Sequence, residues 1–159
     1  MNLKKFAALG LVLFSVSCGD DESRLNGASN FTLFIPDVLK VNFTDLDVEK
    51  GGNVCMSVVS EGADFPEVKE EEAEFAVCIP VEAAALEGVE VEIPDGVYAV
   101  AAFHDENSNG EIDKNFFGIP TEKIGFSKNP RLIPVPGFDQ CKFDVEGNTI
   151  ISIKLKKIF

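Results

Sequence analysis

The chain has 159 residues, a formal net charge of −13 and a sequence pI near 4.4. Its 27 Asp and Glu outnumber its 14 Lys and Arg, which argues against binding to nucleic acid or anionic lipid, because such binding depends on clustered Lys and Arg. Cations are the small partners that this surface attracts, although acidity can also simply keep an exported protein soluble.

The chain begins with the pattern of a secretory signal peptide. A positively charged start precedes an apolar run over residues 6–16, which is too short to span a bilayer. We therefore expect export, with residues 1–17 removed. The next residue is Cys18, as in bacterial lipoproteins, and we favour lipid attachment at Cys18 over a plain secretory cleavage, although Ser15 stands where a lipoprotein signal usually has Leu.

Three parts of the chain follow from this reading: a signal peptide over 1–17, a polar lipid-anchored tether over 18–30 and a single domain over 31–159. The tether sequence is acidic and has no hydrophobic periodicity. We predict a membrane-anchored lipoprotein of the bacterial cell envelope, with a soluble periplasmic or secreted protein as the alternative. About 142 residues remain after cleavage (159 − 17), which is enough for one domain with its own core.

Alternation of apolar and polar residues predicts about seven short strands and no long helix. The strands are expected over 39–44, 54–59, 75–79, 89–93, 97–103, 143–145 and 151–155, with one helical turn at 83–86. A Gly-Gly turn between the first two predicts that they form a hairpin. The strand over 97–103 is apolar on both faces, which is typical of a central strand. The pattern favours an all-β fold, an antiparallel β-sandwich.

Three cysteines follow Cys18. Cys141 has the alternation of a core-facing residue. Cys55 and Cys78 each lie on the face opposite the main apolar set of their strand, and they are the pair that we expect to form a disulfide if any forms. No Cys-x-x-Cys occurs, so a zinc cluster is not indicated.

A loop dense in oxygen ligands follows the central strand. Its spacing matches the first part of a calcium loop, with a glycine at the sixth position, Gly110. The candidate metal ligands are Asp105, Asn107, Asn109, Glu111 through its carbonyl, and Asp113. The twelfth position is Phe116, where a helix-loop-helix hand carries a bidentate Glu. A further ligand must therefore come from Glu122 or from water.

The same loop can also be read as a hairpin connection without metal, in which Asx turns satisfy the backbone. The sequence does not decide between the two. Two carboxylates and two amides make a weakly charged ligand set, so calcium would bind with a dissociation constant on the order of 10⁻⁴–10⁻³ M.

The stretch Tyr98–Asn129 resembles the signature of a family of bacterial exported proteins called domain of unknown function 2141. The matching residues are Tyr98, Ala99, His104, Asp105, Asn107, Asn109, Gly110, Asp113, Phe117, Gly118, Ile119, Pro120, Glu122, Gly125, Phe126, Ser127 and Asn129. Weaker similarity extends from about Val38 to Leu155. The resemblance implies a small β-sandwich of the transthyretin-like or immunoglobulin-like kind and carries no established activity. Residues 122–124 read Glu-Lys-Ile, where the family often has Glu-Gly-Tyr.

Several residues of that signature form a loop motif of unknown role: His104, Gly118, Pro120, Glu122, Gly125, Phe126 and Ser127. The only histidine, His104, could act as a general base, but no nucleophile motif accompanies it, and we favour a hydrogen-bonded residue that orients the loop. Phe116, Phe117 and Phe126 lie in the same segment, and we expect them to pack beneath the loop.

We therefore predict an exported, lipid-anchored, non-catalytic binding or structural module with a calcium-stabilised loop. Its partners would be the membrane, through the lipid, and an unknown protein or carbohydrate of the envelope, with no nucleic acid. One alternative is a structural envelope protein without a metal site. A third is a small hydrolase that uses His104 and a loop carboxylate.

Overall fold

The computed structural model describes residues 37–68 and 72–158. Phe34–Phe159 form a compact unit of their own. The predicted signal peptide, the tether and Cys18 lie outside the described residues.

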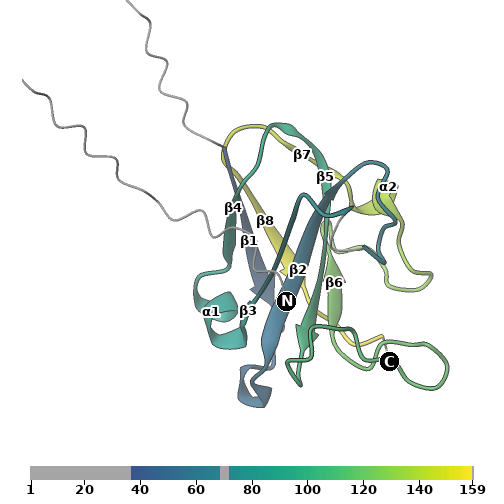
Figure 1. Cartoon of the computed structure of the whole chain (residues 1–159). Coiled ribbons are helices and arrows are strands. Elements are labelled where there is room, and N and C mark those ends of the chain that lie inside the picture. Colours follow the sequence, from purple (N-terminus) through teal and green to yellow (C-terminus); the bar gives the residue numbers. More distant parts are fainter. Residues whose placement is uncertain (1–36, 69–71, 159) are drawn as a thin grey trace, which may run out of the picture. The chain divides into compact units, whose positions relative to one another are not determined.

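Two β-sheets make up the domain, and the predicted all-β sandwich is confirmed (Figure 1). The three-stranded sheet has the order β4 (Val89–Glu92), β1 (Val38–Thr44) and β8 (Thr149–Lys154). The five-stranded sheet has the order β3 (Phe75–Pro80), β2 (Asn53–Ser60), β5 (Gly96–Asp105) and β6 (Ile124–Phe126), and β7 (Phe143–Val145) also pairs with β5. The central position predicted for the strand over 97–103 is thus correct.

Helical structure is limited to short pieces. These are the 3₁₀ turn η1 (Val48–Lys50), α1 (Val81–Leu86) and α2 (Phe138–Cys141). The helical turn predicted at 83–86 lies within α1, whereas α2 was not predicted. Among the described residues, no helix has the length and apolar character needed to cross a membrane.

The predicted hairpin of the first two strands is wrong. β1 pairs with β4 and β8, whereas β2 pairs with β3 and β5 in the other sheet. The turn after η1 contains Gly51 and Gly52, both with positive φ, and it takes the chain from one sheet to the other. Alternation along the two strands specified which faces are buried, but not which strands exchange hydrogen bonds.

The strands of the structure differ from the prediction in two further respects. The first and last strands, β1 and β8, run parallel to each other, whereas every other strand pair is antiparallel. The structure also contains β6, a three-residue strand that the sequence pattern did not predict. The sequence of β6, Ile-Gly-Phe, has no polar residue that would mark an alternation, and β6 forms because it pairs with β5 over Ala101–Phe103.

The main core fills the space between the two sheets. Alternate residues of β1, β2, β4 and β5 point inward, as their period of two requires. The best-buried members are Leu39, Val41, Val54, Val58, Val81, Val100, Val145, Ile153 and Leu155. A second apolar cluster covers the outer face of β5 and contains Val59, Ala99, Ile124, Phe126 and Cys141. Strand β5 is therefore covered on both faces, as its sequence indicated.

The structure joins Cys55 and Cys78 by a disulfide. The two residues face each other in the register of β2 and β3, which places them on the same side of the sheet. Cys141 is a free thiol at the end of α2 and is fully buried, as the sequence suggested. Burial raises the pKa of Cys141 to about 11, so this thiol is unreactive at neutral pH.

Candidate functional site

The candidate site lies where β5 ends and the chain enters the long connection to β6. Figure 1 shows this connection as a large loop at one end of the sandwich. Most of the residues singled out by the sequence lie in this loop or in the two strands that hold it. The geometry of the loop therefore decides what they can do.

Asp105 begins the loop as a fully buried carboxylate. Its Oδ1 accepts a hydrogen bond from the backbone N–H of Asn109 at 3.1 Å, and its Oδ2 accepts one from Gly110 at 2.8 Å. Gly110 adopts a φ of 79°, which favours glycine. Asp105 thus closes the loop on itself.

Asn107, Asn109 and Asp113 lie together on the open side of the loop. The carboxylate of Asp113 accepts hydrogen bonds from Asn107 Nδ2 at 2.7 Å and from Asn109 Nδ2 at 3.2 Å. The amide oxygens accept backbone N–H groups, Asn107 Oδ1 from Asn109 at 3.0 Å and Asn109 Oδ1 from Glu111 at 2.8 Å. The structure therefore brings together the side chains of four of the five candidate ligands.

Glu122 links the two ends of this loop from its buried side. The residue is 4 % exposed. Its Oε1 accepts the backbone N–H of Glu106 at 2.8 Å, and its Oε2 accepts that of Asp113 at 3.1 Å. Both carboxylate oxygens thus hold the backbone of the loop in place. Glu111, the fifth candidate, has an exposed side chain.

These groups form a set of oxygens of mixed kind. Segment 105–113 contains four acidic residues and no basic residue. Within residues 37–68 and 72–158, however, no three His, Cys, Asp or Glu side chains come close enough together to form a metal site. A cation here would therefore depend on the amide oxygens of Asn107 and Asn109 and on backbone carbonyls, as well as on carboxylates. Oxygen donors of this kind suit a hard cation such as calcium.

His104 lies one residue before the loop and is fully buried. Its Nε2 lies 2.8 Å from the carbonyl oxygen of Gly51, so the imidazole donates a hydrogen bond to the turn after η1. Its Nδ1 has no hydrogen-bond partner among the residues that the structure describes. The hydrogen bond to the Gly51 carbonyl requires a proton on Nε2. His104 thereby fixes the end of β5 to the turn that leads into β2.

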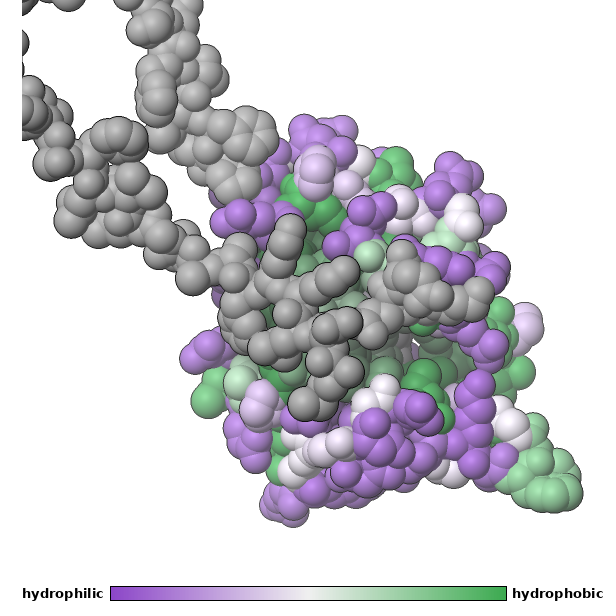
Figure 2. Space-filling model, viewed as in Figure 1, coloured by the Kyte–Doolittle hydropathy of each residue, from purple (hydrophilic) through white to green (hydrophobic). Residues whose placement is uncertain are grey.

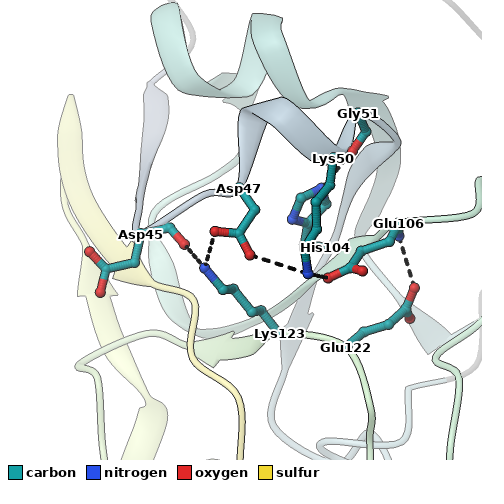
Figure 3. A network of polar contacts seen from close by, with 8 residues as sticks. All are labelled: Asp45, Asp47, Lys50, Gly51, His104, Glu106, Glu122 and Lys123. Carbon is teal, nitrogen blue, oxygen red and sulfur yellow. Dashed lines mark hydrogen bonds and ion pairs between the residues drawn. The ribbon is translucent and has the colours of Figure 1, made fainter.

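A network of ion pairs lies beside His104 (Figure 3). The Nζ atom of Lys123 lies 2.8 Å from Oδ1 of Asp47 and donates to the carbonyl oxygen of Asp45 at 2.6 Å. The Lys123 hydrogen bond holds the pKa of Asp47 below its usual value. This lysine thus ties β6 to the segment that follows β1.

Lys50 extends the network to the loop. Its Nζ lies 2.7 Å from Oε1 of Glu106 and 3.5 Å from Oδ2 of Asp47. The Glu106 hydrogen bond raises the pKa of Lys50. The sequence pattern did not identify Lys50 or Lys123, because their contacts with Glu106 and Asp47, respectively, join residues more than fifty positions apart.

The segment Gly125–Asn129 serves the fold. A Cβ on Gly125 would lie 2.7 Å from the carbonyl oxygen of Lys154, so the glycine permits the close approach of β8. Ser127 accepts the backbone N–H of Val100 and donates to the carbonyl of Cys141 at 2.7 Å. Asn129 forms hydrogen bonds with the backbone of Ser152 and Lys154. The segment Gly125–Asn129 thus fastens β6 to its neighbours.

The aromatic residues of the segment do not all behave as predicted. Phe126 is buried and packs edge-to-face with Phe65, with ring centroids 5.6 Å apart. The packing predicted for Phe116 and Phe117 is wrong, because they are 97 % and 82 % exposed. They lie at the tip of a narrow turn closed by the pairing of Lys114 with Pro120.

Two shallow hollows lie on the described surface, and neither includes His104. One, of about 490 Å³, is lined by Asp45, Leu46, Asp47, Lys123, Leu155, Lys156 and Lys157. The other, of about 450 Å³, is lined by Lys40, Leu86, Glu87, Gly88 and Glu90.

Comparison with known proteins gives one match. A family model described as an uncharacterized protein conserved in bacteria matches residues 41–152. No curated protein and no solved structure matches the chain. The matched range includes the whole candidate loop, its clamp Glu122 and the segment that fastens β6. The chain therefore belongs to the bacterial family of domain of unknown function 2141.

Proposed function

We propose that this protein is an exported, lipid-anchored binding or structural module of the bacterial envelope, without catalytic activity, whose loop 105–113 is stiffened by calcium. The observation that carries the calcium proposal is the arrangement of the loop oxygens. Six side-chain oxygens, from Asp105, Asn107, Asn109 and Glu122, are held by backbone N–H groups of the same loop. Oxygens held in this way lose little freedom when a cation binds.

The donor set fits a weak calcium site. Asp105, Asn107, Asn109 and Asp113 stand at the first, third, fifth and ninth positions of the loop, and the carbonyl of Glu111 stands at the seventh. A bound cation would be attracted by Asp113, which now accepts only amide hydrogens. It would also offset the mutual repulsion of four acids in nine residues.

A non-catalytic role is supported by His104. A general base must come within hydrogen-bond reach of the proton that it removes. The imidazole of His104 is fully buried, and its Nε2 is occupied by the Gly51 carbonyl. A substrate would have to displace core residues to reach it, which disfavours the hydrolase alternative.

We expect calcium to raise the melting temperature of the protein comprising residues 19–159, which contains the whole compact unit Phe34–Phe159. A ligand that binds only the folded state stabilises it by RT ln(1 + [L]/Kd). With about 5 mM calcium and a Kd of about 0.1 mM, the gain is about 2.3 kcal/mol, or several degrees. The measurement is a thermal melt in excess EGTA and then in calcium.

A matched pair of variants makes this measurement specific. Asp113→Ala removes a candidate ligand, whereas Glu111→Gln removes the same charge from a side chain that is not a candidate ligand. We expect the calcium response to be lost in the first and retained in the second. If the parent protein melts at the same temperature with and without calcium, the calcium proposal is wrong and the loop is a metal-free hairpin connection.

The lipid anchor has its own test. When the full-length chain is expressed in a bacterial host, we expect it to sediment with the membranes, and we expect Cys18→Ala to shift most of it to the soluble fraction. Three acyl chains anchor a protein firmly, and their loss leaves no other attachment of comparable strength. Equal membrane fractions for parent and variant would contradict lipidation at Cys18.

A further inference from the structure

The most exposed apolar side chains near the candidate site are Phe116 and Phe117. Their rings pack edge-to-face with centroids 5.7 Å apart and an interplanar angle of 83°. Figure 2 shows a green protrusion at the lower right, where Figure 1 places the loop between β5 and β6. Ile112 of the same loop is also exposed, at 37 %. Exposed apolar groups that protrude in this way mark a contact with a membrane or with another protein.

Most backbone N–H groups of this aromatic tip, residues 115–119, have hydrogen-bond partners within the tip. The side-chain oxygen of Asn115 accepts the N–H groups of Phe117 at 2.9 Å and Ile119 at 3.1 Å. Asn115 N–H donates to the Ile119 carbonyl, and Gly118 N–H donates to the Asn115 carbonyl. Four of the five N–H groups in the tip therefore have partners within it. Such a tip can leave water at a small cost in lost hydrogen bonds.

We propose that the aromatic tip docks into the interfacial region of a lipid bilayer with low surface charge. The tip is a narrow wedge of two side chains, and a specific protein interface usually needs about 800 Å² from each partner with an apolar centre. Residues around the wedge do not extend it, because Glu111 and Lys114 beside it are charged and exposed. A bilayer interface requires only a few apolar side chains above its surface.

Two other possible binding partners of the tip, a sugar chain and a second copy of the protein, fit the geometry less well. Rings at 83° to each other cannot both lie flat against one sugar chain, so the pair is not a stacking platform. A second copy would bring together two loops of like charge. Residues 105–122 contain five acids and one Lys, which gives −4 for each copy, and like charges in close contact repel.

The same charge specifies which lipids are suitable. A segment with a net charge of −4 is repelled by an anionic membrane surface but not by a zwitterionic one. The tip is therefore expected to prefer phosphatidylcholine to mixtures with anionic lipid, which is the opposite of the usual preference of basic peripheral proteins.

The position of the tip allows contact with the membrane that would hold the proposed anchor. The described chain begins next to Val38, the first residue of β1. The start of β1 lies beside the start of β8, because these two strands are parallel. Strand β5 starts at the same end of the sandwich, because Gly96 pairs with Val145, which lies just before β8 in the chain. The tip lies at the opposite end, a ten-residue strand away, or about 33 Å. The 19 positions from Cys18 to Asp37 reach at most about 65 Å. The anchor would raise the local concentration of the tip but is not needed for it to bind.

The experiment uses the unacylated protein comprising residues 19–159 and vesicles of phosphatidylcholine, alone or with 30 % phosphatidylglycerol, in EGTA. We expect sedimentation with the neutral vesicles and weaker binding to the anionic ones, with part of the difference removed by salt. The double variant Phe116→Ser/Phe117→Ser should bind at least about tenfold more weakly, because it loses most of the apolar area that enters the interface. Its melting temperature should stay unchanged, because both side chains are exposed.

The control is Leu86→Ser, which removes another exposed apolar side chain, 85 % exposed, from α1. It should bind vesicles like the parent. A second measurement uses Phe117→Trp, since the chain has no tryptophan; its fluorescence should shift to shorter wavelengths on neutral vesicles. Absence of binding to neutral vesicles, equal binding by the double variant, or stronger binding to anionic vesicles would overturn the proposal and leave a protein partner for the tip. Because EGTA is present throughout, these outcomes do not depend on calcium.

Discussion

The Gly52→Ala variant is expected to lose about 3 kcal/mol of unfolding free energy and to melt about 10 °C below the parent. A Cβ at this position would clash with the backbone oxygen of Asp105 and would lie 2.9 Å from Cα of Glu106. Neither atom can yield easily, because Asp105 is held in β5 by its pairing with Asn53. The φ of 83° adds the strain of a left-handed residue, about 1–2 kcal/mol, to an overpacking cost of about 1–3 kcal/mol.

The neighbouring glycine provides the control for this prediction. Gly51 also has a positive φ, 67°, but a Cβ there would have no heavy atom within 4 Å. Gly51→Ala should therefore cost only the left-handed strain, about 1 kcal/mol. Chemical denaturation of both variants measures the difference. Equal losses would show that the contact with Asp105 does not limit this turn.

Removal of the disulfide between Cys55 and Cys78 is the second change with a large expected effect. The two cysteines are 23 residues apart, and a cross-link over a loop of this length stabilises a protein by about 3 kcal/mol, mainly by restricting the unfolded chain. β3 is also an edge strand that pairs only with β2. We therefore expect the Cys55→Ser/Cys78→Ser variant to melt several degrees below the parent.

Chemical reduction of the parent protein distinguishes the effect of losing the disulfide from the effect of introducing two serines. Cys78 is exposed, so a phosphine reductant can reach the sulfur of this edge strand. The reductant should lower the melting temperature of the parent toward that of the double variant and should leave the double variant unchanged. Cys141, buried and free, provides no second site for this effect. A parent that melts equally with and without reductant would contradict the stabilising role of the disulfide.

The strands illustrate what periodicity can and cannot predict. Val54, Met56 and Val58 alternate with less apolar residues, and all three lie in the core, because side chains of a strand point alternately to its two faces. The same alternation led to the wrong partner for β2, because hydrogen bonding between strands leaves no mark on the sequence of either strand. β6 escaped prediction because Ile-Gly-Phe has no polar residue that would mark an alternation.

The candidate site shows the same division. The spacing of Asp105, Asn107, Asn109 and Asp113 predicted that their oxygens would gather, and the structure brings these side chains together. The role of Glu122 as a clamp on the two ends of the loop depends on a strand that returns beside β5. The partners of Lys123 come from the segment after β1, and Lys50 reaches Glu106 after β5. These partners are distant in sequence, and no local pattern identifies them.

The sequence by itself determined the class of fold, the faces of most strands and the family, because each of these depends on local alternation, composition or a contiguous motif. It indicated which two cysteines would pair, but the structure showed that the disulfide forms. Only the tertiary structure showed which sheet each strand joins, that His104 is buried and hydrogen-bonded to the Gly51 carbonyl, and that Phe116 and Phe117 are exposed. Each of these features depends on which segments, distant in sequence, pack against the residue or strand in question. Phenylalanine is apolar wherever it stands, and only packing decides whether other atoms cover it.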